Sequence, residues 1–581
     1  MKLASRSKSK RAAGHILLTV SVLLGISAIT VAGVYGYARS NQKLNQRNND
    51  YTLAVCAAEA ATEKVLSQIT TDFQSYGDGY LQQHLDNYRA MVPTSSESSV
   101  WTNFDFQDLA HQDNHVEVQF TTLGGFAPVA GQYGPLQGWN DRLRILSNAR
   151  PLTSLDGVVG SVYQDINLTR IPIFQYAIFY NVLLEFTPLP PMVVTGPVHC
   201  NTNIYMNPAG SLTFMDDVTS SGTIVMGPYP VSQLNMSLGG SVTFNGAHDS
   251  GVSTMNLPIG TNNSPAAVQQ ILMPPPNGES PQSSMGQQRF YNKADLVILV
   301  SNNTVVAESG LASSFAYTVP TNELSLFLKT NVSFYNKREA KTVQAVQLDV
   351  GKLVLWNATN QSIRPHLPMQ DVQTIYIADE RTVGSGVEPG VRLVNGSTLT
   401  PQGLTVASPD PVYIWGDYNV TSSGRGTTNT IGTLPASIAA DAITILSTAW
   451  NDANSALSLS SRQAGDTTVN AAFFTGIVAS SGSSDSGGVE NFPRFLEDWT
   501  DNTLTYNGSM VCMFYSTIGT GTWKGIGSTY DIYNPPNRNW AWDQNYQYRD
   551  KLPPATPSLT VLVRSGWRMP TAYTTNTLAG F

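Results

Sequence analysis

An uncharged apolar segment from Ile16 to Ala38 constrains this chain more than any other feature. Its 23 residues would form a helix of about 35 Å, long enough to cross the hydrocarbon core of a bilayer. A secretory signal is the competing interpretation, but its apolar stretch is usually only about 7 to 15 residues long and ends at a small-x-small cleavage site. The length therefore favours a retained membrane span over residues 16–38, with the lipid bilayer as a partner.

Positive charge around this span predicts its orientation. The first eleven residues contain five cations and no acid, whereas three cations follow the span. Because cations concentrate on the cytoplasmic side, we expect a cytoplasmic N-terminus. The expected location is therefore the inner (cytoplasmic) membrane, crossed once, with the C-terminal bulk periplasmic or extracellular.

A helical pattern of apolar residues continues beyond the span and predicts that the helix leaves the membrane as a spine. Its members are Leu44, Tyr51, Val55, Ala58, Thr62, Val65, Ile69 and Phe73. Within it lies an alanine-rich stretch, whose small side chains let a neighbouring helix approach closely. We term four of its residues the helix-packing box: Ala57, Ala58, Glu59 and Ala60.

The leader ending at Gly14, the apolar run that starts at His15, and the helix-packing box together resemble the N-terminal region of PilX-type minor pilins. These belong to the type IV pilin-like proteins of bacteria. The resemblance covers about the first 75 residues. It implies cleavage by a prepilin peptidase between Gly14 and His15, and a helix that bundles with other pilin-like subunits through the box.

Two positions depart from the major pilin pattern, which has an aromatic residue at the first mature position and Glu at the fifth. His15 and Thr19 occupy these positions here. A Glu within the membrane is costly unless paired, so in pilins it marks a specific partner contact. Its absence counts against ordinary filament incorporation and leaves a priming, tip or non-filament role open.

The charge balance beyond the span excludes one class of partner. Eight of the 33 cations precede residue 48, and all 41 acids follow residue 49, which leaves 25 cations against 41 acids and a net charge of −16. Such a surface argues against binding to nucleic acid. Charged residues make up 13 % of the chain, against about 25 % in typical soluble domains. Extracellular β-rich proteins often have this polar, weakly charged composition.

From Met192 onward the chain predicts short strands separated by Gly, Asn and Pro turns, and the same texture returns after Val372. Such spacing is typical of sandwiches, barrels and β-solenoids. Loose alternation and very short strands favour an irregular, right-handed β-helix-like solenoid. The segments Val412 to Asn419 and Ala440 to Ser447 also resemble large PilX-associated β-helical proteins. The expected fold is mainly β with a long N-terminal α-helix and an inserted α+β unit.

Changes in composition divide the chain into seven segments. The apolar segment Phe174 to Phe186 is interpreted as a buried helix that ends at a Pro-rich stop. The expected segments are a basic leader (1–14), a transmembrane and spine helix (15–75), a mixed α/β connecting region (76–190), a first solenoid part (191–259), an inserted α+β unit (260–371), a second solenoid part (372–520), and an aromatic-rich C-terminal cap (521–581).

Catalytic motifs are scarce. The sequence has no HExxH, no P-loop and no GxGxxG after a strand. The tetrapeptide from Asp485 to Gly488 is similar to the nucleophile segment of trypsin-like proteases, but it lies in a Ser/Gly-rich turn and no histidine follows residue 366. Because a catalytic triad needs all its parts, a flexible loop is the favoured interpretation. We therefore expect no enzyme activity and no cofactor.

The sequence assigns no metal site and leaves two states of the cysteines open. His111 and His115 could share a metal only on a helix, and Asp498, Asp501 and Asn502 lack the EF-hand order, so no metal site is assigned. The chain has three cysteines, Cys56, Cys200 and Cys512. Either Cys200 and Cys512 form a disulfide, or all three cysteines are free, buried thiols.

Tryptophans concentrated in the C-terminal third are candidates for surface contacts with sugars or proteins, and burial inside the cap is the alternative. The residues singled out are Trp415, Trp499, Trp540 and Trp542.

Two functions of different class remain. The first is a non-catalytic, membrane-anchored pilin-like surface protein, acting in assembly of a type IV pilus-like filament or secretion apparatus, or in adhesion. The alternative is an envelope-tethered, β-helical carbohydrate-active enzyme or carbohydrate-binding protein. The missing catalytic grouping favours the first.

Overall fold

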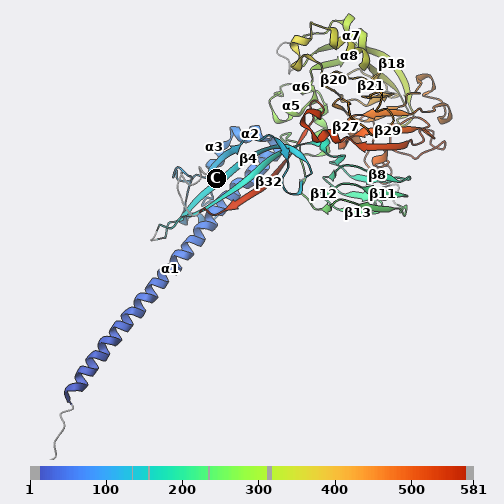
Figure 1. Cartoon of the computed structure of the whole chain (residues 1–581). Helices are drawn as coiled ribbons and strands as arrows, with labels where there is room; N and C mark the ends of the chain where they lie inside the picture. The colour runs from blue at the N-terminus through green and yellow to red at the C-terminus, as the bar shows by residue number, and fades with distance from the viewer. Residues whose placement is uncertain (1–12, 134, 155–156, 233–235, 311–316, 571–581) are drawn as a thin grey trace, which may run out of the picture.

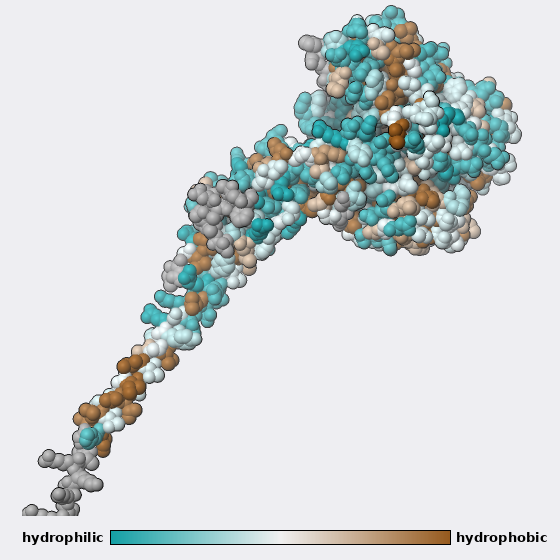
Figure 2. Space-filling model, viewed as in Figure 1, coloured by the Kyte–Doolittle hydropathy of each residue, from teal (hydrophilic) through white to brown (hydrophobic). Residues whose placement is uncertain are grey.

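A single long helix leads into a large β-rich body (Figure 1). The structure is a computed structural model and describes residues 13–133, 135–154, 157–232, 236–310 and 317–570. Helix α1 (Ala13–Tyr76) is continuous over 64 residues. Its N-terminal part includes an apolar window of mean hydropathy 2.3, none of which is buried (Figure 2). By length and composition, this helix can cross a membrane.

The C-terminal half of α1 packs against an antiparallel sheet, which we term the stalk sheet (Figure 1). The sheet has the order β1-β4-β5-β32, with β2 and β3 also paired to β4. Its strands are β1 (Phe104–Gln107), β2 (Glu117–Thr122), β3 (Phe126–Pro128), β4 (Gln137–Pro151), β5 (Gly160–Pro172) and β32 (Ser558–Arg568). Two short helices, α2 (Asp78–Gln83) and α3 (Leu85–Arg89), follow α1.

The predicted apolar stripe on α1 is confirmed over its C-terminal part. Ala58, Thr62, Val65, Ile69 and Phe73 are all buried. The two earlier members, Leu44 and Tyr51, are exposed because the stalk sheet does not extend to them. The amphipathic pattern therefore serves packing onto the chain's own sheet from about residue 54 onward.

Gly160 allows the close approach of α1 to the stalk sheet. A Cβ atom at this position would lie 2.4 Å from the Val55 nitrogen and 2.5 Å from the Ala54 carbonyl carbon, both backbone atoms of α1. A helix backbone cannot yield locally as a side chain can. We expect Gly160→Val to displace α1 and to lower the free energy of unfolding by about 1–3 kcal/mol, measured by denaturant unfolding.

Gly125 provides the matched control for this substitution. No atom lies within 4 Å of a Cβ built there. Gly125→Val should therefore change the unfolding free energy much less than Gly160→Val. Equal stability of the two variants would show that the contact between α1 and β5 is not close-packed at Gly160.

The body is inserted between β5 and β32. The chain leaves the stalk sheet after Pro172 and returns at Ser558, and these two residues pair with each other across the two strands. The body therefore hangs from two adjacent strands, one from each end of the inserted segment. We use "body" for residues 173–557 below.

The first part of the body consists of short parallel strands in three sheets. Ile178, Val198, Val218 and His248 are successive partners in one sheet. The chain visits the three sheets in turn before it returns to the first. These strands are β6 (Ile178–Tyr180), β7 (Leu184–Phe186), β8 (Met192–Val194), β9 (Val198–Cys200), β10 (Ile204–Met206), β11 (Ser211–Phe214), β12 (Val218–Ser220), β13 (Ile224–Met226), β14 (Ser241–Phe244) and β15 (His248–Ser250).

The second part of the body joins the first through a shared sheet of eleven strands, ordered β15-β12-β9-β6-β30-β27-β24-β22-β20-β16-β17. Most of its pairs are parallel, and the two parts of the body meet where β30 pairs with β6. The added strands are β16 (Leu296–Val300), β17 (Val305–Ser309), β20 (Thr374–Asp379), β22 (Leu404–Ala407), β24 (Ala436–Ala440), β27 (Ala472–Ile477) and β30 (Met510–Tyr515).

Two further sheets complete this part. The six-stranded sheet has the order β18-β19-β21-β23-β25-β28, and the three-stranded sheet has the order β26-β29-β31. Their strands are β18 (Leu328–Asn336), β19 (Lys341–Asp349), β21 (Val387–Val394), β23 (Val412–Trp415), β25 (Ile443–Leu446), β28 (Arg494–Phe495), β26 (Thr467–Asn470), β29 (Thr503–Gly508) and β31 (Asn537–Trp542). The helices of the body are α4 (Pro265–Gln269), α5 (Ser284–Gln288), α6 (Phe290–Lys293), α7 (Thr321–Phe327) and α8 (Val350–Thr359). The fold is thus a long N-terminal apolar helix followed by many, mostly parallel β-sheets.

The predicted buried helix from Phe174 to Phe186 is wrong. The segment forms a short 3-10 turn (Ile173–Gln175) and then strands β6 and β7. Burial is correct, since the residues of both strands are buried. A strand buried on both faces shows no alternation, so an apolar run of this length does not distinguish it from a buried helix.

Cys200 and Cys512 are both buried and free, and Cys56 is exposed on α1. Tyr180 pairs with Cys512 on one side and with Cys200 on the other, so a whole strand separates the two cysteines. Two strand spacings amount to about 10 Å, beyond the Cα separation of about 7 Å that a disulfide spans. Burial raises the pKa of the Cys200 thiol to about 11, which keeps it protonated and unreactive.

Candidate functional site: the anchor helix and the neck

The predicted cleavage junction lies at the start of α1. Gly14 and His15 are in its first turns, and His15 is exposed. The hydroxyl of Thr19 donates to the His15 carbonyl oxygen at 2.6 Å, and the hydroxyl of Ser21 donates to the Leu17 carbonyl oxygen at 2.8 Å. These polar side chains of the apolar segment are therefore satisfied within the helix, as a bilayer environment requires.

The helix-packing box is divided between two environments. Ala57 and Ala58 are buried against the stalk sheet, with 2 % and 0 % of their surface exposed. Glu59 and Ala60 are half-buried. The first two small residues therefore serve the intramolecular contact, and the side of α1 that remains accessible next to the box carries Glu59 and Ala60.

Polar contacts fix α1 on the stalk sheet. The Gln164 amide nitrogen donates to the Thr62 hydroxyl at 3.0 Å and to the Glu63 carboxylate at 2.8 Å. Arg564 on β32 donates twice to the same carboxylate, at 2.7 Å each. The buried hydroxyl of Tyr88 donates to Asp72 at 2.7 Å. These contacts therefore hold α1 against β5, β32 and α3.

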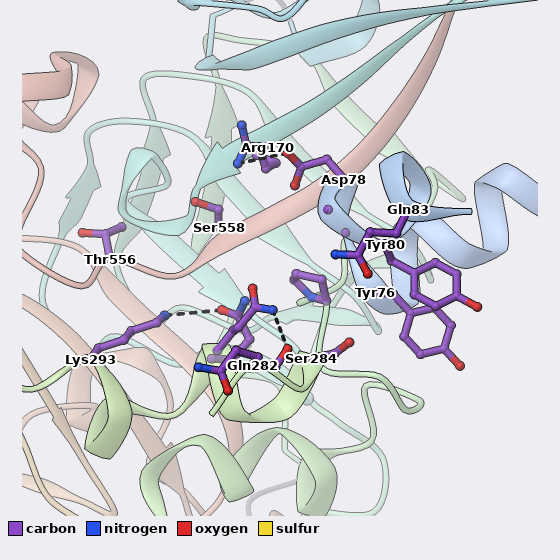
Figure 3. Close-up of a pocket in the computed structure, with 15 residues that line it drawn as sticks. Tyr76, Asp78, Tyr80, Gln83, Arg170, Gln282, Ser284, Lys293, Thr556 and Ser558 are labelled. Carbon is purple, nitrogen blue, oxygen red and sulfur yellow. Dashed lines mark hydrogen bonds and ion pairs between the residues drawn. The ribbon is translucent and has the colours of Figure 1, made fainter. Parts of the chain in front are cut away.

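A polar cleft of about 310 Å³ lies at the neck, where α1 ends and the body begins (Figure 3). The rings of Tyr76 and Tyr80 stack on one side, with centroids 4.4 Å apart. Arg170 and Asp78 form an ion pair at 3.4 Å on another side. The remaining lining is mostly amide and hydroxyl side chains: Gln83, Gln282, Ser284, Gln287, Gln288, Thr556 and Ser558.

Lys293 is the second cation of this cleft. Its ammonium donates to the Gln288 amide oxygen at 3.4 Å (Figure 3). Burial lowers the pKa of Lys293 to about 8, because desolvation disfavours the charged form. The cleft can hold a polar ligand by hydrogen bonds, and the carboxylate in its lining, that of Asp78, is paired with Arg170 rather than with a second carboxylate.

The protease-like tetrapeptide is buried rather than exposed. Asp485 and Ser486 are 4 % and 7 % exposed. Asp485 accepts a hydrogen bond from the Ser232 hydroxyl, and the Ser486 hydroxyl oxygen accepts from the Gly488 nitrogen at 3.1 Å. Within the described ranges no histidine contacts Ser486. The arrangement is that of a structural turn, and the expected flexible loop is instead a packed one.

The weaker metal candidates have structural roles. His111 and His115 lie in irregular segments rather than on a helix, and the His115 ring nitrogen contacts the Asp113 carbonyl oxygen at 2.9 Å. The Asp498 carboxylate accepts from the Thr500 hydroxyl at 2.6 Å and from the Asn534 amide at 2.8 Å. Among the residues that the structure describes, no group of three or more His, Cys, Asp or Glu side chains could hold a metal ion.

The four tryptophans differ in how much of each side chain is exposed. The prediction of a surface contact is wrong for Trp499, which is fully buried with its ring 5.7 Å from that of Phe495. Trp540 and Trp542 are half-buried on β31 and line a cavity of only about 30 Å³. Trp415 is half-buried at the end of β23 and lines an open groove. The sequence could not rank the four, because burial depends on distant segments.

Comparison with known proteins gives little direct guidance. No protein-family model matches the chain, and no curated protein matches it. Among solved structures, the competence-associated pilin ComZ from Thermus thermophilus is similar over 90 % of this chain and 98 % of that chain, with 10 % identical residues and a TM-score of 0.27. A TM-score of this size carries no argument about function, so the functional conclusion rests on the chain itself.

Proposed function

We propose that this protein is a non-catalytic, membrane-anchored, pilin-like surface protein. Helix α1 is the observation that supports it: 64 continuous residues, exposed and apolar at the start, and packed on an antiparallel sheet at the end. The first half has the length to span a bilayer, and the second half holds the body at a distance from it. The cations before residue 16 favour a cytoplasmic N-terminus, which leaves the acidic body outside the cytoplasm.

The proposed role is in assembly of a type IV pilus-like filament or secretion apparatus, or in surface adhesion. Other pilin-like subunits would pack along the accessible side of α1, next to Glu59 and Ala60. Thr19 supports a role in which no buried Glu contacts a neighbouring subunit. Its hydroxyl already donates to the His15 carbonyl oxygen and needs no partner from another chain. A priming or tip subunit, which has neighbours on one side only, fits this arrangement.

We further propose that the parallel sheets of the body wind as an irregular solenoid. The support is the pairing pattern, in which Ile178, Val198 and Val218 follow one another at steps of one coil. Stacked coils bury a continuous core that a single coil could not provide.

The first test is the identity of the mature N-terminus. In cells with a prepilin peptidase, we expect N-terminal sequencing of the membrane-bound protein to begin at His15, and in cells without it at Met1. Gly14→Val should block cleavage, because it places a branched side chain immediately before the proposed cut. Detection is by Edman sequencing or by mass spectrometry of the N-terminal peptide.

Gly25→Ala is the matched control, since this glycine lies inside the apolar segment and has nothing within 4 Å of its Cβ position. It should be cleaved as the unaltered chain is. A Met1 start in both strains would remove the pilin-like interpretation.

A further inference from the structure

A groove of about 550 Å³ lies at the carboxyl ends of strands β19, β21 and β23 of the body. We propose that it binds a neutral saccharide through Trp415. This inference is independent of how the protein is anchored or processed, because every residue that carries it lies in the body. Three features support it: an indole ring that is fixed before a ligand binds, carboxylates on the rim that are fixed as acceptors, and the net negative charge of the chain beyond residue 47.

Trp415 is held in place before any ligand arrives. The Arg392 guanidinium lies 4.9 Å from the centre of its ring. Arg392 itself is only 2 % exposed, and it donates to the Gln347 amide oxygen at 2.7 and 3.0 Å and to the Asp452 carboxylate at 2.6 Å. A cation over an indole face stabilises the ring's position. The ring can therefore bind a ligand at little cost in side-chain entropy.

The indole nitrogen of Trp415 has no hydrogen-bond acceptor within the described residues, and it is not among the buried unpaired groups there. Its N–H is therefore accessible to solvent. An aromatic face with an unused N–H at its edge suits the apolar C–H face and the hydroxyl rim of a sugar ring.

Two carboxylates on the rim are fixed as acceptors. Asp349 accepts from the Asn395 side-chain amide at 2.9 Å and from the backbone nitrogen of Lys352 at 3.1 Å. Asp417 accepts from Arg425 at 2.6 Å and from the Thr468 nitrogen at 2.8 Å. A carboxylate has about four acceptor positions, so each can accept further hydrogen bonds from ligand hydroxyls.

The strand register places these groups across the groove. Val394 pairs with Asp349 on one side and with Trp415 on the other. Asp349 and Trp415 are therefore separated by two strand spacings, about 10 Å. Asp417 follows Trp415 by two residues. A ligand must extend over this distance to contact all three side chains, which favours an oligosaccharide over a single sugar.

The net charge of the chain beyond the apolar segment disfavours anionic ligands. Within the groove the charges offset one another, because Lys329 lines it beside Asp349 and Asp417, and these two carboxylates are paired with Lys352 at 3.9 Å and Arg425 at 2.6 Å. The part of the chain beyond residue 47 carries a net charge of −16, so the long-range field repels anions. We therefore expect the groove to bind a neutral oligosaccharide in preference to uronic acid polymers and phosphates.

The test is binding of three neutral hexasaccharides, namely cellohexaose, maltohexaose and chitohexaose, to the full-length protein in lipid nanodiscs. Isothermal titration calorimetry measures affinity, and hexagalacturonate is the anionic comparison. We expect at least one neutral hexasaccharide to bind, and Trp415→Ala to weaken that binding about tenfold or more. Trp415→Phe should retain part of the affinity, and hexagalacturonate should bind more weakly than the neutral ligand.

Two further variants separate loss of the groove from loss of the fold. Ser397→Trp adds bulk at an exposed position on the rim and should block binding without removing any packed group. Trp567→Ala removes a tryptophan that is 45 % exposed on the stalk sheet, and should bind as the unaltered protein does. The inference is overturned if no neutral hexasaccharide binds, if Trp415→Ala or Ser397→Trp binds with full affinity, or if hexagalacturonate binds as tightly.

Discussion

Raising the pH from about 5 to about 8 is expected to lower the free energy of unfolding of the body by several kcal/mol. Burial raises the pKa values of Glu388, Asp410 and Glu497 to about 7 each. A carboxyl with a raised pKa binds its proton more tightly in the folded than in the unfolded state. Its stabilising contribution is therefore complete below about pH 4 and is lost as the pH rises through about 7.

The measurement is thermal or denaturant unfolding at both pH values and constant ionic strength. We expect the Tm to be lower at pH 8 by on the order of 5 °C, given about 2 kcal/mol for each of three groups in a large chain. Carboxylates with lowered pKa values, such as Asp531, contribute stability that is lost only in more acidic solution, below about pH 4. They do not reverse the sign between pH 5 and pH 8. Burial lowers the pKa of His199 to about 4, and this group opposes the change by about 2 kcal/mol, which is less than the three carboxyls contribute together.

Glu388→Gln tests the assignment at one residue. One oxygen of Glu388 accepts hydrogen bonds from the Asn336 amide at 3.0 Å and from the Tyr413 hydroxyl at 2.9 Å, while the other oxygen is buried without a partner. Glutamine mimics the protonated carboxyl. The variant should therefore be more stable than the unaltered protein at pH 8 and similar to it at pH 5. Equal pH dependence of the two would show that Glu388 does not titrate in this range.

Asp441→Ala is expected to destabilise the body by about 3–5 kcal/mol. Asp441 is fully buried in the turn between β24 and β25. Its carboxylate accepts hydrogen bonds from three successive backbone nitrogens, those of Thr517 at 2.6 Å, Ile518 at 3.0 Å and Gly519 at 2.7 Å. Alanine would leave three N–H groups without an acceptor just after β30, the strand that joins the two parts of the body.

Denaturant unfolding at pH 7 measures this effect, and Asp441→Asn is the matched control. Asparagine keeps one acceptor oxygen in a side chain of the same shape, so it should lose clearly less stability than alanine. The hypothesis fails if alanine costs less than about 1 kcal/mol, which would mean that water replaces the carboxylate at all three nitrogens.

Features with a local signal were predictable from the sequence. The apolar stripe from Ala58 to Phe73 follows the helical period, and it is buried as soon as one side of α1 is covered. The Phe174 to Phe186 segment failed because its apolar residues suit a strand and a helix equally. The pairing of Ser558 with Pro172 left no trace in either segment, because register between distant strands is set by tertiary packing.

The candidate sites show the same division. Trp415 and Trp499 both stand near acidic residues in the sequence, yet one lines a groove and the other is buried. What separates them is contributed by other segments, such as Arg392 beneath the ring of Trp415. Local composition thus identified tryptophan as a useful residue type, and the fold decided which one is accessible.

The insertion of the body between β5 and β32 has a mechanical consequence. A force that pulls the body away from the membrane would act on the stalk sheet through two neighbouring strands, β5 and β32. The load on β32 reaches α1 through its hydrogen bonds with β5, which extend from Ser558 to Arg568, and through the contact of Arg564 with Glu63. Bonds loaded in shear along their whole length share the force and must break together, whereas a single flexible linker would concentrate it. The pairing of β5 with β32 therefore suits the stalk sheet to transmit tension between the body and α1.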